Sequence, residues 1–294
     1  MKRALIVGCG YTGMHLAARL LEMDFRVVGT TRSGSRAAEL ESAGIEPLAG
    51  ELSDKETLRR IDKLGPEVVA YFVPPQAQDD PLPMVLAATA RAPVEAFVYA
   101  SSTSVYGDRG GDWVDEMTMV RPETPEAEAR QAAERQIVEA TWSYQTRTRI
   151  CRISGIYGPG RTLRRPLESG EYVLIEGHDT WVNRIHVDDL VSGLIAAWQR
   201  GGDGRVYNLV DAEPHRASEY ANLAADLQGL ARPQWIELSA AVERIGKEQL
   251  RRKLGSKRVR SRRLKDDLRV ELQYPTYRDG LPAAVGREGQ SRES

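Results

Sequence analysis

A glycine-rich loop near the N-terminus places the strongest constraint on the fold. The segment Gly8-Cys9-Gly10-Tyr11-Thr12-Gly13 follows the apolar run Ala4–Val7 and opens a helical pattern over Met14–Met23. In a strand–loop–helix unit, the first glycine permits a tight turn, the second lets the backbone approach a pyrophosphate, and the third allows close helix packing. Free N–H groups at the helix start would then face the phosphates. The loop predicts a dinucleotide site formed by Gly8, Gly10, Tyr11, Thr12 and Gly13.

Short apolar runs alternate with helical patterns along the first half of the chain. Runs of this kind are typical of parallel strands that are buried on both faces and joined by right-handed crossovers. The prediction is an α/β fold, a doubly wound parallel sheet (Rossmann) over residues 1–160, with a smaller C-terminal substrate lobe. We place that lobe at 161–281, with 182–210 returning to the main domain and a frayed tail over 282–294. The further strands are expected at Phe25–Gly29, Ile45–Leu48, Glu67–Val73, Val94–Ala100 and Arg149–Ile153.

The end of the second strand bears on which dinucleotide is bound. An acidic residue there usually accepts hydrogen bonds from the adenosine ribose of NAD. This chain instead has Thr30-Thr31-Arg32-Ser33, where an arginine with neighbouring hydroxyls would pair with the 2′-phosphate of NADP. The pattern favours NADP over NAD, although a solvated Arg32 is the simpler alternative. Glu51, after the third strand, is a candidate neighbour of the adenine or an ordinary surface charge.

Composition excludes several classes of protein and partner. The 41 basic and 42 acidic side chains give a net charge of −1, which does not favour nucleic acid as a partner. Two cysteines cannot form a disulfide framework and fit a reducing compartment. The N-terminus lacks the pattern of a signal peptide, and no apolar run approaches the roughly 20 residues of a membrane span. We therefore expect a cytoplasmic protein without membrane or nucleic-acid partners.

Four further segments carry a resemblance to a known family. Val98–Gly107, Arg152–Gly160, Asn183–Leu190 and Tyr207–Val210 resemble motifs of the extended short-chain dehydrogenases/reductases, the NAD-dependent epimerase/dehydratase family. The resemblance covers nearly the whole chain, as far as Tyr274–Leu281. It implies a small-molecule substrate, and dimerisation through two helices of the main domain is usual in that family.

The resemblance also implies a set of catalytic residues, of which only part is present. The family uses a serine or threonine on the fifth strand, and Ser102 stands at that position. It also uses a tyrosine and a lysine four residues apart, which lie on one helical face. Here Glu126 aligns with the tyrosine and Arg130 with the lysine, and no tyrosine in the chain has a lysine four residues later. The chain therefore resembles the atypical branch of the family.

Three interpretations of the altered pair remain open. Glu126 and Arg130 could form a surface ion pair, which contributes only a few tenths of a kcal/mol. Arg130 could instead bind the nicotinamide ribose while Glu126 takes no part in the chemistry. In the third interpretation Glu126 is a general base beside the substrate. Arginine does not release a proton near neutrality, so Arg130 is a binding residue in each case.

Other candidate residues carry weaker signals. His186 with Asp188 and Asp189 lacks the ligand spacing of a zinc site, so we expect no metal and assign these residues to a turn and helix cap. Cys9 is expected to be buried and inert, and Tyr106 to be a packing residue. The aligned arginine of nucleotide-sugar enzymes is Val182 here, which argues against such a substrate.

The segment Arg251–Arg269 is basic, with ten Lys and Arg against two Asp. It is either a solvated face or a surface that attracts an anionic substrate. Two functions remain open for the whole chain. The first is an NADP(H)-dependent oxidoreductase or epimerase/dehydratase with an altered active site. The second is a non-catalytic NADP(H)-binding redox sensor or scaffold.

Overall fold

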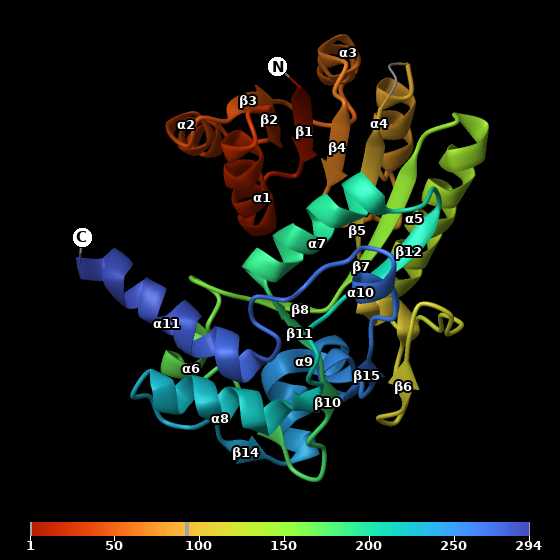
Figure 1. Ribbon diagram of the computed structural model, residues 1–294. Helices are drawn as coiled ribbons and strands as arrows, with labels where there is room; N and C mark the ends of the chain where they lie inside the picture. Colours follow the sequence, from red (N-terminus) through yellow and green to blue (C-terminus); the bar gives the residue numbers. More distant parts are fainter. Residues whose placement is uncertain (1, 92–93, 294) are drawn as a thin grey trace.

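The main domain is built on a seven-stranded sheet whose strands are all parallel (Figure 1). The computed structural model describes residues 2–91 and 94–293, with side chains as far as residue 289. The strand order is β12-β7-β5-β4-β1-β2-β3, which reverses between β1 and β4. This order confirms the predicted doubly wound sheet, and the reversal is where ligands bind in such sheets. The strands are β1 (Arg3–Val7), β2 (Arg26–Thr31), β3 (Glu46–Ala49), β4 (Val68–Tyr71), β5 (Ala96–Ser102), β7 (Thr148–Ile153) and β12 (Arg205–Leu209).

Helices cover both faces of this sheet because successive strand residues point to opposite sides. On β1, Ala4 and Ile6 pack in one apolar cluster while Leu5 and Val7 pack in the other. The first cluster includes side chains of α1 and α7, and the second includes side chains of α3, α4 and α5. The covering helices are α1 (Tyr11–Glu22), α2 (Gly34–Ser42), α3 (Lys55–Leu64), α4 (Leu82–Thr89), α5 (Pro125–Ser143) and α7 (Val187–Arg200).

The second half of the chain adds a smaller lobe below the carboxyl ends of the strands (Figure 1). Its own apolar cores lie around Tyr220 and Tyr277 and around Val173 and Leu250. Segment 182–210 runs from the lobe through β11 and α7 to β12, while the division at residue 160 remains a prediction. The remaining elements are η1 (Thr103–Tyr106), β6 (Trp113–Val114), β8 (Gly155–Tyr157), α6 (Arg164–Glu168), β9 (Leu174–Ile175), β10 (Trp181–Val182), β11 (Arg184–His186), β13 (His215–Arg216), α8 (Ala217–Leu227), β14 (Trp235–Ile236), α9 (Leu238–Leu254), β15 (Arg258–Val259), α10 (Arg263–Asp266) and α11 (Tyr277–Glu293).

The C-terminal segment differs from the expected frayed tail. The helix α11 runs through 282–293, and only Ser294 of the segment lies outside the described residues. The expectation was wrong because composition does not register tertiary contacts. Ala284 is buried, Arg287 pairs with Asp188, and Glu288 accepts a hydrogen bond from Thr162. These contacts hold a polar, glycine-containing helix against the rest of the molecule.

Candidate functional site

The glycine loop has the geometry that its sequence predicts. Gly8 has a φ of +82°, and a Cβ there would come within 2.9 Å of Val73 Cγ2. A Cβ on Gly13 would meet Ile6 at 3.1 Å, so this glycine lets α1 pack on β1. Gly10 has no described atom within 4 Å of its Cβ position, and it lines the adjoining cavity. No side chain caps α1 at Gly10, so backbone N–H groups at the helix start are available to an anion.

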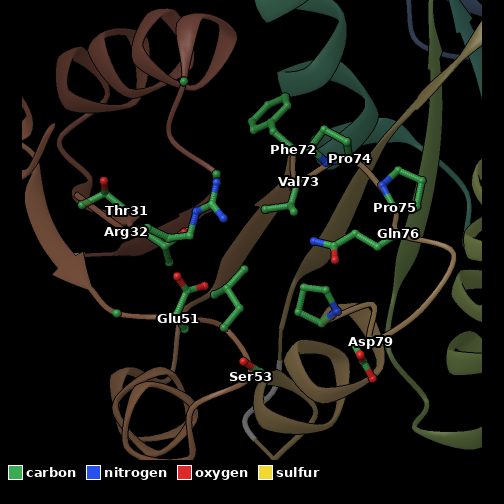
Figure 2. Close-up of a pocket in the computed structure, with 16 residues that line it drawn as sticks. Thr31, Arg32, Glu51, Ser53, Phe72, Val73, Pro74, Pro75, Gln76 and Asp79 are labelled. Atoms are coloured by element: carbon green, nitrogen blue, oxygen red, sulfur yellow. The ribbon is translucent and has the colours of Figure 1, made fainter. Parts of the chain in front are cut away.

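A cavity of about 770 Å³ extends from this loop along the carboxyl edge of β1, β2 and β4. Figure 2 shows Arg32 and Glu51 on one side of the cavity and Val73, Pro75 and Gln76 on the other. The wall that contains Pro75 and Gln76 was missed by the sequence analysis, which considered no residue directly beyond the end of the fourth strand. Its residues could have been found by reading past that strand, because all parallel strands end at the same edge.

Two arginines surround the end of β2 but have different environments. Arg32 is exposed at the cavity, and no acidic partner is found for it within 2–91 and 94–293. Arg36, at the start of α2, donates from Nε and Nη2 to the carbonyl oxygen of Cys9 at 3.3 and 3.0 Å. Arg36 therefore fixes α2 against the glycine loop, while the guanidinium of Arg32 is free to bind a ligand.

A second cavity, of about 350 Å³, continues from the glycine loop toward β5. The two cavities share Gly8, Gly10 and Phe72. Ser102 and Arg130 both line the second one, so the structure brings these two candidates together. Ser102 Oγ accepts a hydrogen bond from the backbone of Ser104 at 3.1 Å, and Arg130 Nη1 donates to the carbonyl of Ala100 at 3.3 Å. A polar hydroxyl and a fixed positive charge therefore face the same space.

Glu126 is not among the residues that line these cavities. Its carboxylate is half exposed, and Glu126 Oε1 lies 3.6 Å from Nη1 of Arg252, a residue of α9 in the smaller lobe. The i,i+4 pair with Arg130 is not formed in the described structure. Hydrogen bonds at the start of α5, with a smaller contribution from the charge of Arg252, lower the pKa of Glu126. This environment favours an ionised surface carboxylate.

The weaker candidates occupy structural positions. Tyr106 is buried, and its hydroxyl donates to Asn208 Oδ1 at 2.8 Å. His186 caps α7 by accepting from the Asp188 backbone, and Asp189 accepts from the backbone of Tyr274. Burial raises the pKa of the Cys9 thiol to about 11, which disfavours a reactive thiolate. No cluster of three or more His, Cys, Asp or Glu suited to a metal occurs in the described part of the chain.

A buried ion pair beneath Ser102 was not anticipated from the sequence. Glu134 of α5 binds Arg152 of β7 through two bonds of 2.9 and 2.7 Å, and both side chains are 8% exposed. Glu134 also accepts from Ser101 Oγ at 2.6 Å. Arg152 in turn donates to the Tyr106 hydroxyl at 3.1 Å. The network ties α5 to the ends of β5 and β7, where the second cavity opens.

A buried carboxyl group at the end of β12 gives a prediction about pH. Asp211 is 3% exposed, its Oδ2 has no hydrogen-bond partner in the described structure, and burial raises its pKa to about 8. An unfolded aspartate ionises near pH 4. The folded state therefore holds its proton more tightly, and this group's contribution to stability is lost as the pH rises from about 4 to 8.

We expect the parent protein to lose stability relative to Asp211→Asn between pH 5 and pH 8. Urea unfolding of both proteins at the two pH values measures the difference. Asp226→Asn is the control, because the pairing of Asp226 with Arg232 lowers its pKa and it stays ionised over this range. A parent-to-variant difference that is the same at both pH values would show that Asp211 is already ionised at pH 5.

Comparisons with known proteins agree with this architecture. Residues 4–209 match the model of the NAD dependent epimerase/dehydratase family. Protein YeeZ of Escherichia coli strain K12 is 30% identical over 256 residues, which cover 80% of this chain and 87% of that protein. A 4-hydroxy-2-methyl-3-oxo-4-farnesyl-3,4-dihydroquinoline-1-oxide ketoreductase of Stigmatella aurantiaca is 26% identical and covers 78% of this chain and 74% of its own length.

A solved structure extends the likeness to the whole chain. A functionally unknown conserved protein of Silicibacter pomeroyi is 32% identical, with a TM-score of 0.86 over 98% of this chain and 99% of the other. No helix within the described ranges has the length and apolarity that a membrane span requires. The match across the sheet, the glycine loop and the late strand identifies this chain as a member of the NAD dependent epimerase/dehydratase family.

Proposed function

We propose that this protein binds NADP(H) in the cleft at the carboxyl ends of the strands and acts as an oxidoreductase on a small molecule. Arg32 carries the proposal: it follows β2 directly, lines the cavity and has no acidic partner among the described residues. A 2′-phosphate is the ligand group that suits an arginine beside Thr31 and Ser33. Glu51 lines the same cavity and would lie near the adenosine.

The cleft fits the rest of a nicotinamide dinucleotide. Gly10 leaves room for a pyrophosphate at the uncapped start of α1, next to the backbone of Tyr11 and Thr12. The second cavity would take the nicotinamide end, where the bound cofactor supplies or accepts a hydride. The Stigmatella relative is named a ketoreductase, which supports this class of reaction.

Two residues of this chain would act on the substrate. The Ser102 hydroxyl is suited to hydrogen-bond a substrate carbonyl oxygen, and the Arg130 charge to stabilise the negative charge that develops on it. Arginine is not an acid near neutrality, and our alignment finds no counterpart of the family's tyrosine, so we assign the proton to solvent. Arg130 is also suited to hold the nicotinamide ribose.

Paired glycine variants test where the cofactor binds. We expect Gly10→Ala to keep the stability of the parent but to weaken NADPH binding about tenfold or more, because its Cβ would enter the space assigned to the pyrophosphate. Gly8→Ala should instead lower the free energy of unfolding by about 1–3 kcal/mol, since its φ is positive and Val73 is close. Urea unfolding and NADPH fluorescence titration measure the two effects. Unchanged NADPH binding by Gly10→Ala would place the pyrophosphate elsewhere.

One observation favours the alternative, a non-catalytic NADP(H)-binding redox sensor. Our alignment gives Glu126 the position of the family's tyrosine, yet Glu126 pairs with Arg252 and does not line the cleft. A protein without a proton donor at this place would bind the cofactor and change shape with its redox state. The two functions predict different behaviour of the same variant.

The Ser102→Ala variant distinguishes the oxidoreductase from the redox sensor. In the enzyme, it should lower kcat for NADPH oxidation about a hundredfold against the best substrate of an aldehyde and ketone panel. Its NADPH affinity should stay within about twofold of the parent, because Ser102 acts on the substrate. Thr103→Ala is the matched hydroxyl control outside the cavity. NADPH binding without oxidation of any panel member would support the sensor instead.

A further inference from the structure

A third cavity, of about 620 Å³, adjoins the nicotinamide end of the cleft. It shares Ile156 and Arg161 with the second cavity. Arg161, Arg164, Arg165 and Arg184 line it, and Glu288 of α11 is its acidic lining residue. Figure 1 shows α6, which carries two of these arginines, beside α8 and α11. The sequence analysis looked for positive charge at Arg251–Arg269 and missed this cluster, because Arg184 joins the three neighbouring arginines only in the folded chain.

Aromatic rings hold two of the four guanidinium groups by their faces. Arg184 lies 3.6 Å above the ring of Tyr220, which is fully buried. Arg161 lies 4.2 Å above the ring of Tyr11. Stacking occupies the face of a guanidinium and leaves the N–H donors at its edge free. The Nε atom of Arg184 is buried and has no hydrogen-bond partner in the described structure.

The positive charge of this cavity is only partly balanced. Glu288 lies 3.9 Å from Arg164 and accepts from Thr162, and Glu168 outside the cavity also binds Arg164. Arg161, Arg165 and Arg184 form no ion pair in the described ranges. Four guanidinium groups against these two carboxylates leave about two positive charges. A phosphate monoester carries about −1.5 to −2 charges at neutral pH and three acceptor oxygens.

We propose that this cavity binds the phosphate group of a phosphorylated carbonyl or alcohol substrate. The proposal rests on the oxidoreductase function proposed above and names its substrate class. The shared residues Ile156 and Arg161 would let one molecule reach from the arginines to Ser102. A single carboxylate on the substrate would balance only about half of the excess charge. The family's nucleotide-sugar arginine is Val182 here, so these arginines form a different anion site.

The test is a calorimetric titration of inorganic phosphate into the protein saturated with NADPH. Saturation fills the 2′-phosphate and pyrophosphate positions, so that added phosphate reports on the third cavity alone. We expect Arg184→Gln to weaken phosphate binding about tenfold or more. Arg165→Gln should weaken phosphate binding to the same extent. Because Arg165 is exposed, this variant should fold even if the loss of stacking on Tyr220 destabilises Arg184→Gln. Arg59→Gln, on the surface of α3, is the matched control.

Each outcome bears on one proposal. Weaker phosphate binding by both variants with unchanged NADPH affinity supports the phosphate site. Phosphate binding that Arg165→Gln leaves unchanged would overturn it, as would acetate binding as tightly as phosphate. A protein that binds phosphate through these arginines but does not bind NADPH would overturn only the proposed oxidoreductase function.

Discussion

Replacement of Arg32 by alanine is expected to weaken NADPH binding by about ten- to a hundredfold while leaving NADH binding nearly unchanged. The physical reason is the charge of the 2′-phosphate, which NADH lacks. A hydrogen bond to a charged group contributes roughly 1.5–3 kcal/mol, and each 1.4 kcal/mol is about tenfold in affinity. Arg32 has no ion pair in the described structure, so its removal breaks no ion pair within the protein.

The two dissociation constants are measured by fluorescence titration at fixed ionic strength, because a phosphate contact weakens with salt. Arg59→Ala removes another exposed arginine, on α3, and should change neither constant. Arg36→Ala offers a contrast. It frees the Cys9 carbonyl and loosens the glycine loop, so both cofactors should bind more weakly. Equal losses of NADPH and NADH in Arg32→Ala would remove the argument for NADP.

Replacement of Glu134 by alanine is expected to lower the free energy of unfolding by about 3–5 kcal/mol. The variant leaves the guanidinium of Arg152 buried with no carboxylate, and it removes the acceptor of Ser101. An uncompensated buried charge costs far more than the ion pair itself contributes. Urea unfolding at neutral pH measures the loss, and Glu139→Ala on the exposed side of α5 should change stability by about 0.5 kcal/mol or less.

A double variant shows where that cost arises. Glu134→Leu combined with Arg152→Met removes both charges and keeps most of the buried volume. We expect it to be more stable than Glu134→Ala alone, because apolar replacements of a buried ion pair are often neutral. A double variant as unstable as the single one would mean that the hydrogen bonds to Ser101 and Tyr106, and not the unpaired charge, set the loss.

Local patterns predicted the parts of the molecule that depend on local geometry. The glycine loop is determined by φ at Gly8 and by close packing at Gly13, which are properties of single positions. The parallel sheet follows from apolar runs that are buried on both faces, as β4 is throughout Val68–Tyr71. Ser102 and Arg130 could be placed together because Ser102 lies in a segment that resembles a known family and Arg130 was aligned with that family's lysine.

Contacts between distant segments could not be predicted in this way. The helical repeat placed Glu126 beside Arg130, but Arg252 from α9 reaches Glu126 in the folded chain. Arg152 interrupts an apolar strand, and nothing near it in the sequence indicates that Glu134 is its partner. Arg161, Arg164 and Arg165 are neighbours in the sequence, but Arg184 joins them only because β11 pairs with β8. A single sequence does not specify these pairings.

The return of the chain to the central sheet has a consequence during protein synthesis. β12 pairs with β7, and α7 covers one face of the sheet. Both elements come later in the chain than residues 161–181, which belong to the smaller lobe. When the ribosome has made residues 1–160, β7 has an open edge and the apolar face beneath α7 is bare. Open edges and bare faces promote aggregation of nascent chains. The seven-stranded sheet is therefore complete only after Leu209 has been made, and we expect the shorter nascent chain to aggregate more readily than the whole protein.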